Sequence, residues 1–203
     1  YKYVISTDFK VTEETIVKAF KILFNKNITE QEAIPNLKKY YPKKIEKVDT
    51  LVVGIGAGAR YKMLRPNLLC EILKLFINKK NIKEIIFLGA GDRDQKYLNE
   101  IRKGINFTDF NIENLVNKIS LDESIDIISE CQYYLGFESG LFHIAASLNV
   151  STFGVFTKAN EFSHTNWKNV TIFSGNPSTS NNDEYFGNSE LNNISLDEIE
   201  KLL

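Results

Sequence analysis

Residues 133–156, with the sequence YYLGFESGLFHIAASLNVSTFGVF, constrain the fold more than any other stretch of the chain. They begin with an apolar run at 133–137, which has the length of a buried strand, and continue through a tight turn at 138–140. The apolar side chains of residues 141–148 then recur at helical spacing, and a second apolar run covers 152–156. Strand, turn, helix and strand in this order predict one unit of a parallel α/β sheet.

The remaining sequence repeats this alternation. The further predicted strands cover residues 51–55, 85–88 and 170–173. The further predicted helices cover residues 66–77, 94–103, 120–129 and 195–203. Ser120 and Glu123 form a capping box at the start of one of these helices, and Ser195 caps the last one. Residues 106–110 fit either a short strand or a loop. We therefore predict an α/β fold, a doubly wound, Rossmann-like parallel sheet, from residue 49 to residue 203.

Charge and hydropathy exclude several classes of protein. The 203 residues carry a formal net charge of −1, so there is no overall basic field of the kind that nucleic-acid binding requires. No apolar run approaches the roughly 20 residues of a membrane-spanning helix, so no membrane span is expected. Residues 1–10 lack the pattern of a signal peptide. The sequence begins without Met, and we expect either a fragment or a processed chain.

The cysteines indicate a reducing compartment. Cys70 and Cys131 both fall in predicted helical segments, and we expect them to be free, buried thiols in a cytoplasmic protein. With two Cys and two His in the chain, no spacing supports a structural zinc site.

Three loops at predicted strand ends carry candidate ligand-binding residues, because open parallel sheets bind ligands at the carboxyl ends of their strands. In the first loop, alternating glycines let the backbone approach a ligand closely, and two cations are available to neutralise phosphate. The alternative is a glycine-rich turn with two solvated cations. The loop is not a Walker motif, and its third glycine falls one position early for a dinucleotide fingerprint. Its candidate residues are Gly56, Ala57, Gly58, Arg60 and Lys62.

The second loop follows the strand at 85–88 and contains Gly89 and Asp92. A carboxylate at this place can accept hydrogen bonds from ribose hydroxyls, as it does in dinucleotide-binding folds. Asp is also a favoured N-cap residue, so plain helix capping by Asp92 is the alternative.

The third loop is the turn within residues 133–156. Free amides at the start of the helix, around Ser139 and Gly140, form a site for phosphate, and Glu138 is placed to bind a sugar hydroxyl. His143 either bonds a phosphate oxygen or satisfies a backbone carbonyl, and Leu141 fits the core or a pocket wall. The glycine positions do not match the Gly-x-Ser-x-Gly nucleophile elbow of a hydrolase.

Taken together, these loops resemble the C-terminal, nucleotide-sugar-binding half of the heptosyltransferase-like glycosyltransferases of family 9, which have the two-domain GT-B fold. That family shows a Gly-Ala loop followed by Lys and Pro, matched here by residues 58–66. It also shows an Asn-Leu to Ser-Leu element, matched by residues 114–121, and an Asp-Ser/Thr-Gly-x-x-His motif before a small-residue helix. Residues 138–143 match that motif, with Glu138 in place of the usual Asp.

The resemblance implies a domain organisation and a reaction. Residues 1–48 would be the remnant of an N-terminal acceptor domain and a linker, and 49–203 the nucleotide-sugar-binding domain. The activity implied is inverting transfer of a heptose-like sugar or hexose from a nucleotide-diphospho-sugar to a lipopolysaccharide or other surface glycan. No metal and no cofactor are expected, because a helix dipole and Lys62 can share the stabilisation of the leaving diphosphate. The general base is expected in the N-terminal domain and is not assigned to a residue here.

Further expectations concern partners, and two other functions stay open. The partners implied are the donor and a glycan or glycolipid acceptor, without nucleic acid, and peripheral attachment at the inner membrane is left open. One alternative function is an NAD-binding Rossmann domain of a dehydrogenase or epimerase, against which the glycine spacing speaks. The other is a non-catalytic nucleotide-binding module.

Overall fold

The computed structural model of the chain describes residues 36–41, 47–104, 110–156, 167–175 and 191–203, together with residues 21, 25–27 and 29. Most of the predicted acceptor-domain remnant at 1–48 lies outside the described residues, as does nearly all of the segment 106–110. The division of the chain at residue 48 therefore stays a prediction.

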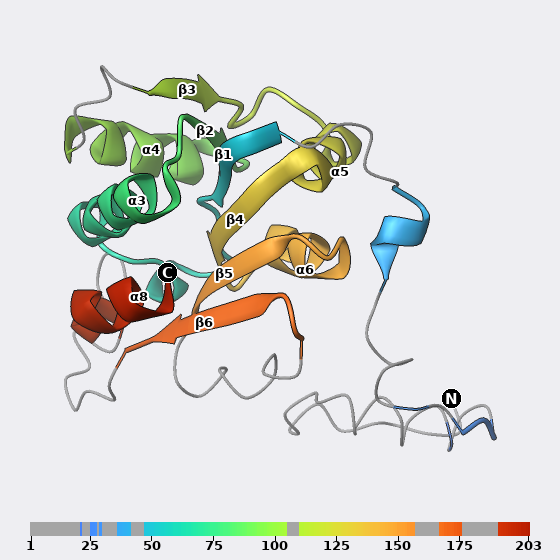
Figure 1. Cartoon of the computed structure of the whole chain (residues 1–203). Helices are drawn as coiled ribbons and strands as arrows, with labels where there is room; N and C mark the ends of the chain where they lie inside the picture. Colours follow the sequence, from blue (N-terminus) through green and yellow to red (C-terminus); the bar gives the residue numbers. More distant parts are fainter. Residues whose placement is uncertain are drawn as a thin grey trace.

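Six parallel strands form a single sheet in the order β3-β2-β1-β4-β5-β6, and this confirms the predicted doubly wound α/β fold (Figure 1). The strands are β1 (Lys47–Gly54), β2 (Glu84–Leu88), β3 (Asn111–Asn114), β4 (Cys131–Phe137), β5 (Ser151–Phe156) and β6 (Val170–Ser174). The chain first builds outward from β1 to β3 and then returns to add β4 on the other side of β1. The strand order thus reverses between β1 and β4, which is where such folds bind ligands.

Helices cover both faces of the sheet, with α3, α4 and α8 on one side and α5 and α6 on the other (Figure 1). The helices are α3 (Pro66–Lys80), α4 (Asp92–Gly104), α5 (Leu121–Glu130), α6 (Gly140–Ser147) and α8 (Leu196–Leu202). Short 3-10 turns occur at η1 (Leu37–Lys39), η2 (Arg60–Lys62) and η3 (Leu191–Asn193). Local sequence sets several helix ends: Pro66 opens α3, Asn81 closes it in the left-handed conformation, and Ser120 and Glu123 make both bonds of the predicted capping box.

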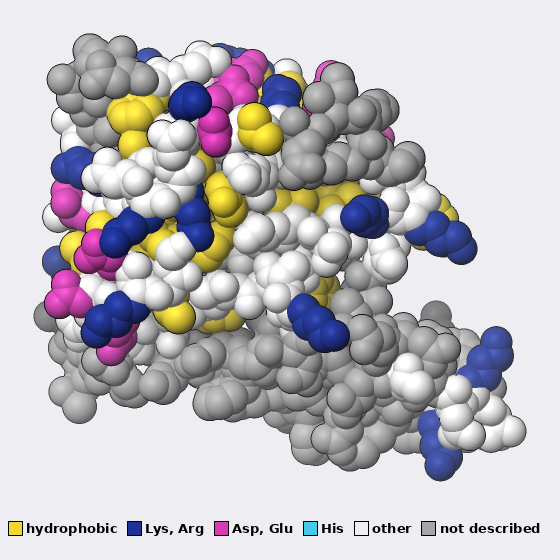
Figure 2. Space-filling model, in the orientation of Figure 1, with side chains coloured by type: hydrophobic (Ala, Val, Ile, Leu, Met, Phe, Trp, Pro, Cys, Tyr) yellow, Lys and Arg dark blue, Asp and Glu magenta, His cyan; other side chains and the backbone are white. Residues whose placement is uncertain are grey.

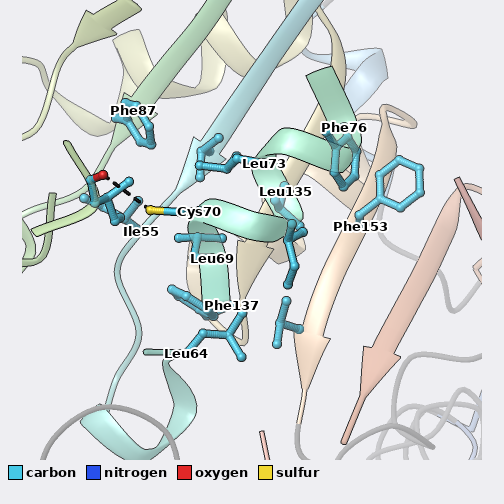
Figure 3. Close-up of a cluster of buried hydrophobic side chains, with 14 of the residues drawn as sticks. Ile55, Leu64, Leu69, Cys70, Leu73, Phe76, Phe87, Leu135, Phe137 and Phe153 are labelled. Carbon is cyan, nitrogen blue, oxygen red and sulfur yellow. Dashed lines mark hydrogen bonds between the residues drawn. The ribbon is translucent and has the colours of Figure 1, made fainter. Parts of the chain in front are cut away.

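The larger core lies between the sheet and the layer of α3, α4 and α8. Figure 3 shows Leu69, Leu73 and Phe76 of α3 directed toward side chains of the central strands, among them Leu135 and Phe153. The rings of Phe76 and Phe153 meet edge to face with their centroids 4.9 Å apart. Because these strands are covered on both faces, they read as nearly continuous apolar runs, and that is why they could be predicted.

A row of three glycines marks the opposite face of the sheet, toward α5 and α6. Gly54, Gly136 and Gly154 are register partners across β1, β4 and β5. A Cβ at Gly54 or Gly136 would collide with the side chain of Tyr134, and one at Gly154 would collide with the rings of Phe142 and Phe156. The glycines therefore let large aromatic side chains lie against the sheet close to its carboxyl edge.

Two details of the structure differ from the prediction. Residues 111–114 form strand β3, which was not predicted because the sequence NIEN has one apolar residue; as an edge strand it is alternately exposed and half-buried. Cys131 was expected in a helix but is the first residue of β4. Helix α5 ends at Glu130, and Cys131 follows at once in an extended conformation, with no glycine or proline to mark the boundary. Cys70 does lie in α3, and both thiols are free and buried as predicted. Burial raises the pKa of the Cys70 thiol to about 11, which makes it a poor nucleophile.

The described surface carries charges of both signs. Figure 2 shows basic and acidic side chains interspersed on the left and top of the face it presents, and mainly basic ones on its right. Within the described residues, no helix is long and apolar enough to cross a membrane.

Candidate functional site

A cleft of about 670 Å³ lies at the carboxyl ends of β1, β2 and β4 and at the start of α5. Its position beside β1 and β4 coincides with the reversal of strand order. The volume falls within the range of small-molecule sites, roughly 300 to 1,000 Å³. The sheet therefore brings all three predicted loops to one cleft.

Ten of the twelve predicted site residues line this cleft. They are Gly56, Ala57, Gly58, Lys62, Gly89, Glu138, Ser139, Gly140, Leu141 and His143. The other two, Arg60 and Asp92, are exposed residues near the cleft that do not line it. Ligand binding by each of the twelve stays a prediction.

Lys62 and Glu138 form an ion pair in the cleft, with Nζ 3.0 Å from Oε1. Both side chains are 21% exposed, so the pair is screened by solvent less than a surface pair would be. Lys62 belongs to η2 after β1, and Glu138 follows β4 directly. A cation and a carboxylate from two adjacent strand ends are thus held against each other.

His143 lies in the first turn of α6, and its backbone N–H donates to the carbonyl of Ser139 at 3.3 Å. Burial is the largest influence on this side chain and holds the pKa of His143 below its usual range. The Glu138 carboxylate raises that pKa and the Lys62 ammonium lowers it further. The imidazole is therefore neutral at neutral pH, with one ring nitrogen that donates and one that accepts a hydrogen bond.

Arg93 and Asp94 at the start of α4 also line the cleft, and sequence reasoning passed over both. Asp94 is 3% exposed; its Oδ2 accepts from the Ala90 N–H at 3.0 Å, and its Oδ1 lies 3.3 Å from Nε of Arg93. Arg93 also donates to the carbonyl of Ala57. This pair therefore ties the loop after β2 to the loop after β1.

A signal for Asp94 was present in the sequence. Asp94 precedes the buried residues Tyr97, Leu98 and Ile101 by three, four and seven positions, so it falls on the apolar stripe of an amphipathic helix. A carboxylate on such a stripe is buried, and a buried carboxylate needs partners. That reasoning would have favoured Asp94 over the exposed Asp92.

One wall of the cleft is aliphatic. Ile119 and Leu121 at the start of α5 face the cleft together with Leu141 and Ile144 of α6. Leu121 is 60% exposed, so much of its apolar side chain is open to a ligand in the cleft. A flat apolar group such as a nucleobase would cover such side chains. Ile119, Ser120, Leu121 and Ser124 were missed, because in the sequence this segment reads only as a helix start. Ile144 was missed as a site residue because its spacing marks it only as an apolar position of the helix at 141–148.

The cleft thus combines features suited to a phosphorylated ligand with an apolar ring. The first amides of α6 point beyond the helix without helical acceptors, and Lys62 supplies a positive charge. Carboxylates and the neutral His143 offer hydrogen bonds to hydroxyl groups. Within the described residues there is no group of three or more His, Cys, Asp or Glu side chains that could hold a metal ion. The metal-free mode of binding remains a prediction.

Comparison with known proteins identifies relatives of this chain. Residues 71–191, more than half of the chain, match the family model of glycosyltransferase family 9 (heptosyltransferase), a range that includes the second and third loops but not the first. A lipooligosaccharide heptosyltransferase 2 of Campylobacter jejuni is 24% identical over 118 residues, which are 58% of this chain and 37% of that protein. Among solved structures, E. coli ADP-heptose lps heptosyltransferase II has a TM-score of 0.61 at 18% identity, over 81% of this chain and 47% of that one.

A second solved structure, E. coli heptosyltransferase WaaC with ADP-2-deoxy-2-fluoro heptose, has a TM-score of 0.62 at 15% identity, over 86% of this chain and 52% of that one. The chain therefore spans about half the length of the solved relatives and less of the curated one. The likeness to these solved structures supports the fold alone, whereas the match to the family model assigns the family. On that match, the chain belongs to glycosyltransferase family 9, the heptosyltransferase family.

Proposed function

We propose that this chain forms the donor-binding half of an inverting glycosyltransferase whose donor is an ADP-linked heptose or a similar nucleotide-diphospho-sugar. The observation that carries the proposal is the meeting of Lys62, Glu138 and the first turn of α6 at one cleft. Family membership supports it, as does the relative solved with ADP-2-deoxy-2-fluoro heptose. Family membership also leaves the NAD-binding alternative without support.

The proposed binding mode follows from the charges of the cleft. The diphosphate would lie against the amides of α6 at 139–142 and beneath the loop at Gly56 to Gly58, with Lys62 as its counter-charge. The apolar wall at Leu121 and Leu141 would cover the nucleobase. When the sugar leaves, negative charge grows on the diphosphate, and the same dipole and cation stabilise it. This arrangement needs no metal ion and no cofactor.

The remaining parts of the reaction are proposed to lie in the other half of the GT-B enzyme. The general base and the site for the lipopolysaccharide or other glycan acceptor would come from an N-terminal domain. A gene that encodes such a domain ahead of Tyr1 would favour the enzyme over a non-catalytic module. We propose a cytoplasmic location, in keeping with the free thiols of Cys70 and Cys131.

Calorimetric titration of the 203-residue chain with ADP, UDP and GDP tests the proposal. We expect ADP to bind most tightly, and we expect Lys62→Ala to weaken ADP binding about tenfold, equivalent to about 1.4 kcal/mol. Lys74→Ala is the matched control, because Lys74 also forms an ion pair at 2.8 Å with Glu71, but on the exposed face of α3. Absence of ADP binding at millimolar concentration, or equal effects of the two variants, would overturn the proposal.

A further inference from the structure

Asn117 lies in the loop between β3 and α5, next to residues that line the cleft. Its φ of 61° is in the left-handed region, which asparagine adopts more readily than most other residues. The residue is exposed and is not itself part of the lining. Residues 119–121, which follow it, do line the cleft, as do residues 89 and 90 of the loop after β2. The position of Asn117 is therefore suited to support of the lining rather than to contact with a ligand.

The pairing of β2 with β3 continues past the ends of the two strands and finishes at Asn117. The N–H of Leu115 donates to the carbonyl of Phe87 at 3.0 Å. Two residues later, the N–H of Asn117 donates to the carbonyl of Gly89 at 3.1 Å. The side chain of Asn117 then adds one further step, because its Oδ1 accepts from the N–H of Gly91 and its Nδ2 donates to the carbonyl of Gly91 at 3.3 Å. A side-chain amide offers a donor and an acceptor as a peptide group does, so this one replaces a backbone partner where the chain turns toward α5.

Gly91 connects this contact to the start of α4. Its φ is 89°, a backbone conformation that residues with a side chain rarely adopt. Its carbonyl accepts from the N–H of Gln95 at 3.2 Å as well as from Asn117. Ala90, which precedes Gly91, and Asp94, which follows it by three residues, both line the cleft. A displacement of Gly91 would therefore move part of the lining.

We propose that Asn117 is a positioning residue for the nucleoside of the donor, because its side-chain amide holds the loop at 89–91 against the start of α5. The inference rests on the proposed function of the cleft, in which the nucleobase lies against Leu121. The loop at 89–91 and residues 119–121 form this side of the cleft, whereas Lys62 and the first turn of α6 form the side proposed for the diphosphate. Two loops that are already held together have less freedom to lose when a ligand binds between them. Asn117 should therefore matter for the nucleoside and not for the phosphates.

Titration of the full chain with ADP and, separately, with inorganic pyrophosphate tests the inference. Asn117→Gly tolerates the positive φ and keeps the backbone bond to Gly89, but it removes the amide. We expect it to weaken ADP binding about three- to tenfold and to leave pyrophosphate binding within about twofold. Asn117→Asp keeps an oxygen that can accept from Gly91, so it should lose less ADP affinity. Asn81→Gly is the matched control, since Asn81 also has a positive φ, 52°, but ends α3 at the opposite edge of the sheet, and it should change neither affinity.

A measurement on the free chain tests the contact itself. Hydrogen exchange of the Gly91 amide, followed by NMR, should be faster in Asn117→Gly, because this amide then loses its acceptor in the protein. An unchanged exchange rate would overturn the inference without any ligand.

The outcomes of the titrations separate this inference from the proposed function. If the unaltered chain binds ADP and pyrophosphate, and Asn117→Gly weakens both equally or neither, the inference alone is overturned. If the unaltered chain binds neither ligand, the proposed function fails, and the role of Asn117 in nucleoside binding fails with it.

Discussion

Nζ of Lys62 lies 3.0 Å from Oε1 of Glu138, and this contact joins the loops that follow two adjacent strands, β1 and β4. The pair holds the cation of the cleft in place before any ligand arrives. An incoming diphosphate would compete with Glu138 for Lys62 and would also meet the charge of the carboxylate itself. The balance between these two charges also acts on His143, which makes His143 a probe of the pair.

Replacing Glu138 and replacing Lys62 should shift the pKa of His143 in opposite directions. Glu138→Gln removes the carboxylate that raises this pKa, so we expect the pKa to fall. Lys62→Met removes the cation that lowers it, so we expect the pKa to rise. An NMR titration of the imidazole resonances measures both shifts. Glu71→Gln, which disrupts an exposed ion pair on α3, is the control and should leave the pKa unchanged. Shifts of the same sign in both cleft variants would contradict the electrostatic account.

His143 should make the stability of the fold depend on pH below about 6.5, the usual pKa of histidine in an unfolded chain. Its folded pKa is depressed, chiefly by burial, so between the two pKa values the unfolded chain binds more protons than the folded one. Folding stability due to this residue is therefore fully present above the unfolded pKa and declines as the pH falls toward the folded pKa. Urea denaturation from pH 7.5 to 5 should show a smaller decline for His143→Gln than for the unaltered chain. Equal declines would show that His143 does not contribute to the loss of stability at low pH.

Two glycines of the same loop should respond differently to alanine. A Cβ at Gly56 would collide with Oδ2 of Asp94, whereas a Cβ at Gly58 would meet no atom within 4 Å. We expect Gly56→Ala to lower the free energy of unfolding by about 1 to 3 kcal/mol, because the buried carboxylate cannot move without losing its partners. Gly58→Ala should stay within about 0.5 kcal/mol of the unaltered chain. Urea denaturation of the two variants side by side decides this, and an equal loss in both would mean that the loop, not Asp94, determines the cost.

The sequence predicted those parts of the site that depend on a local residue pattern. It did not predict the contacts that depend on how the strands and helices pack. The glycine loop, the carboxylate and the histidine of residues 138–143 could be read directly, because amides at a helix start bind anions in any sheet of this kind. The contact between Lys62 and Glu138 could not be read, since it requires the knowledge that β1 and β4 are neighbours. Strand β3 was missed because at the edge of the sheet it buries too little to show an apolar pattern.

Asp94 is another residue whose role depends on packing, and it is the subject of the last prediction. The sequence favours Asp92 for the hydroxyl contact because it comes first after the strand, but the lining of the cleft favours Asp94. Asp94→Ala would leave the Ala90 N–H and Arg93 without their carboxylate partner. We expect a loss of about 2 kcal/mol in the free energy of unfolding, less than for a fully buried pair, because Arg93 is 34% exposed and water can solvate it.

Asp92→Ala is the matched control, since it removes an exposed carboxylate from the same helical turn. We expect it to change stability by less than about 0.5 kcal/mol and to leave ADP affinity within about twofold. Asp94→Asn separates the two roles of Asp94: it keeps an oxygen that can accept from Ala90 but removes the charge opposite Arg93, so it should lose less stability than Asp94→Ala. Denaturation and ADP titration of the three variants provide the measurements. A larger loss of ADP affinity in Asp92→Ala than in Asp94→Asn would show that Asp92 makes the contact with the ligand hydroxyl, as the sequence alone predicts.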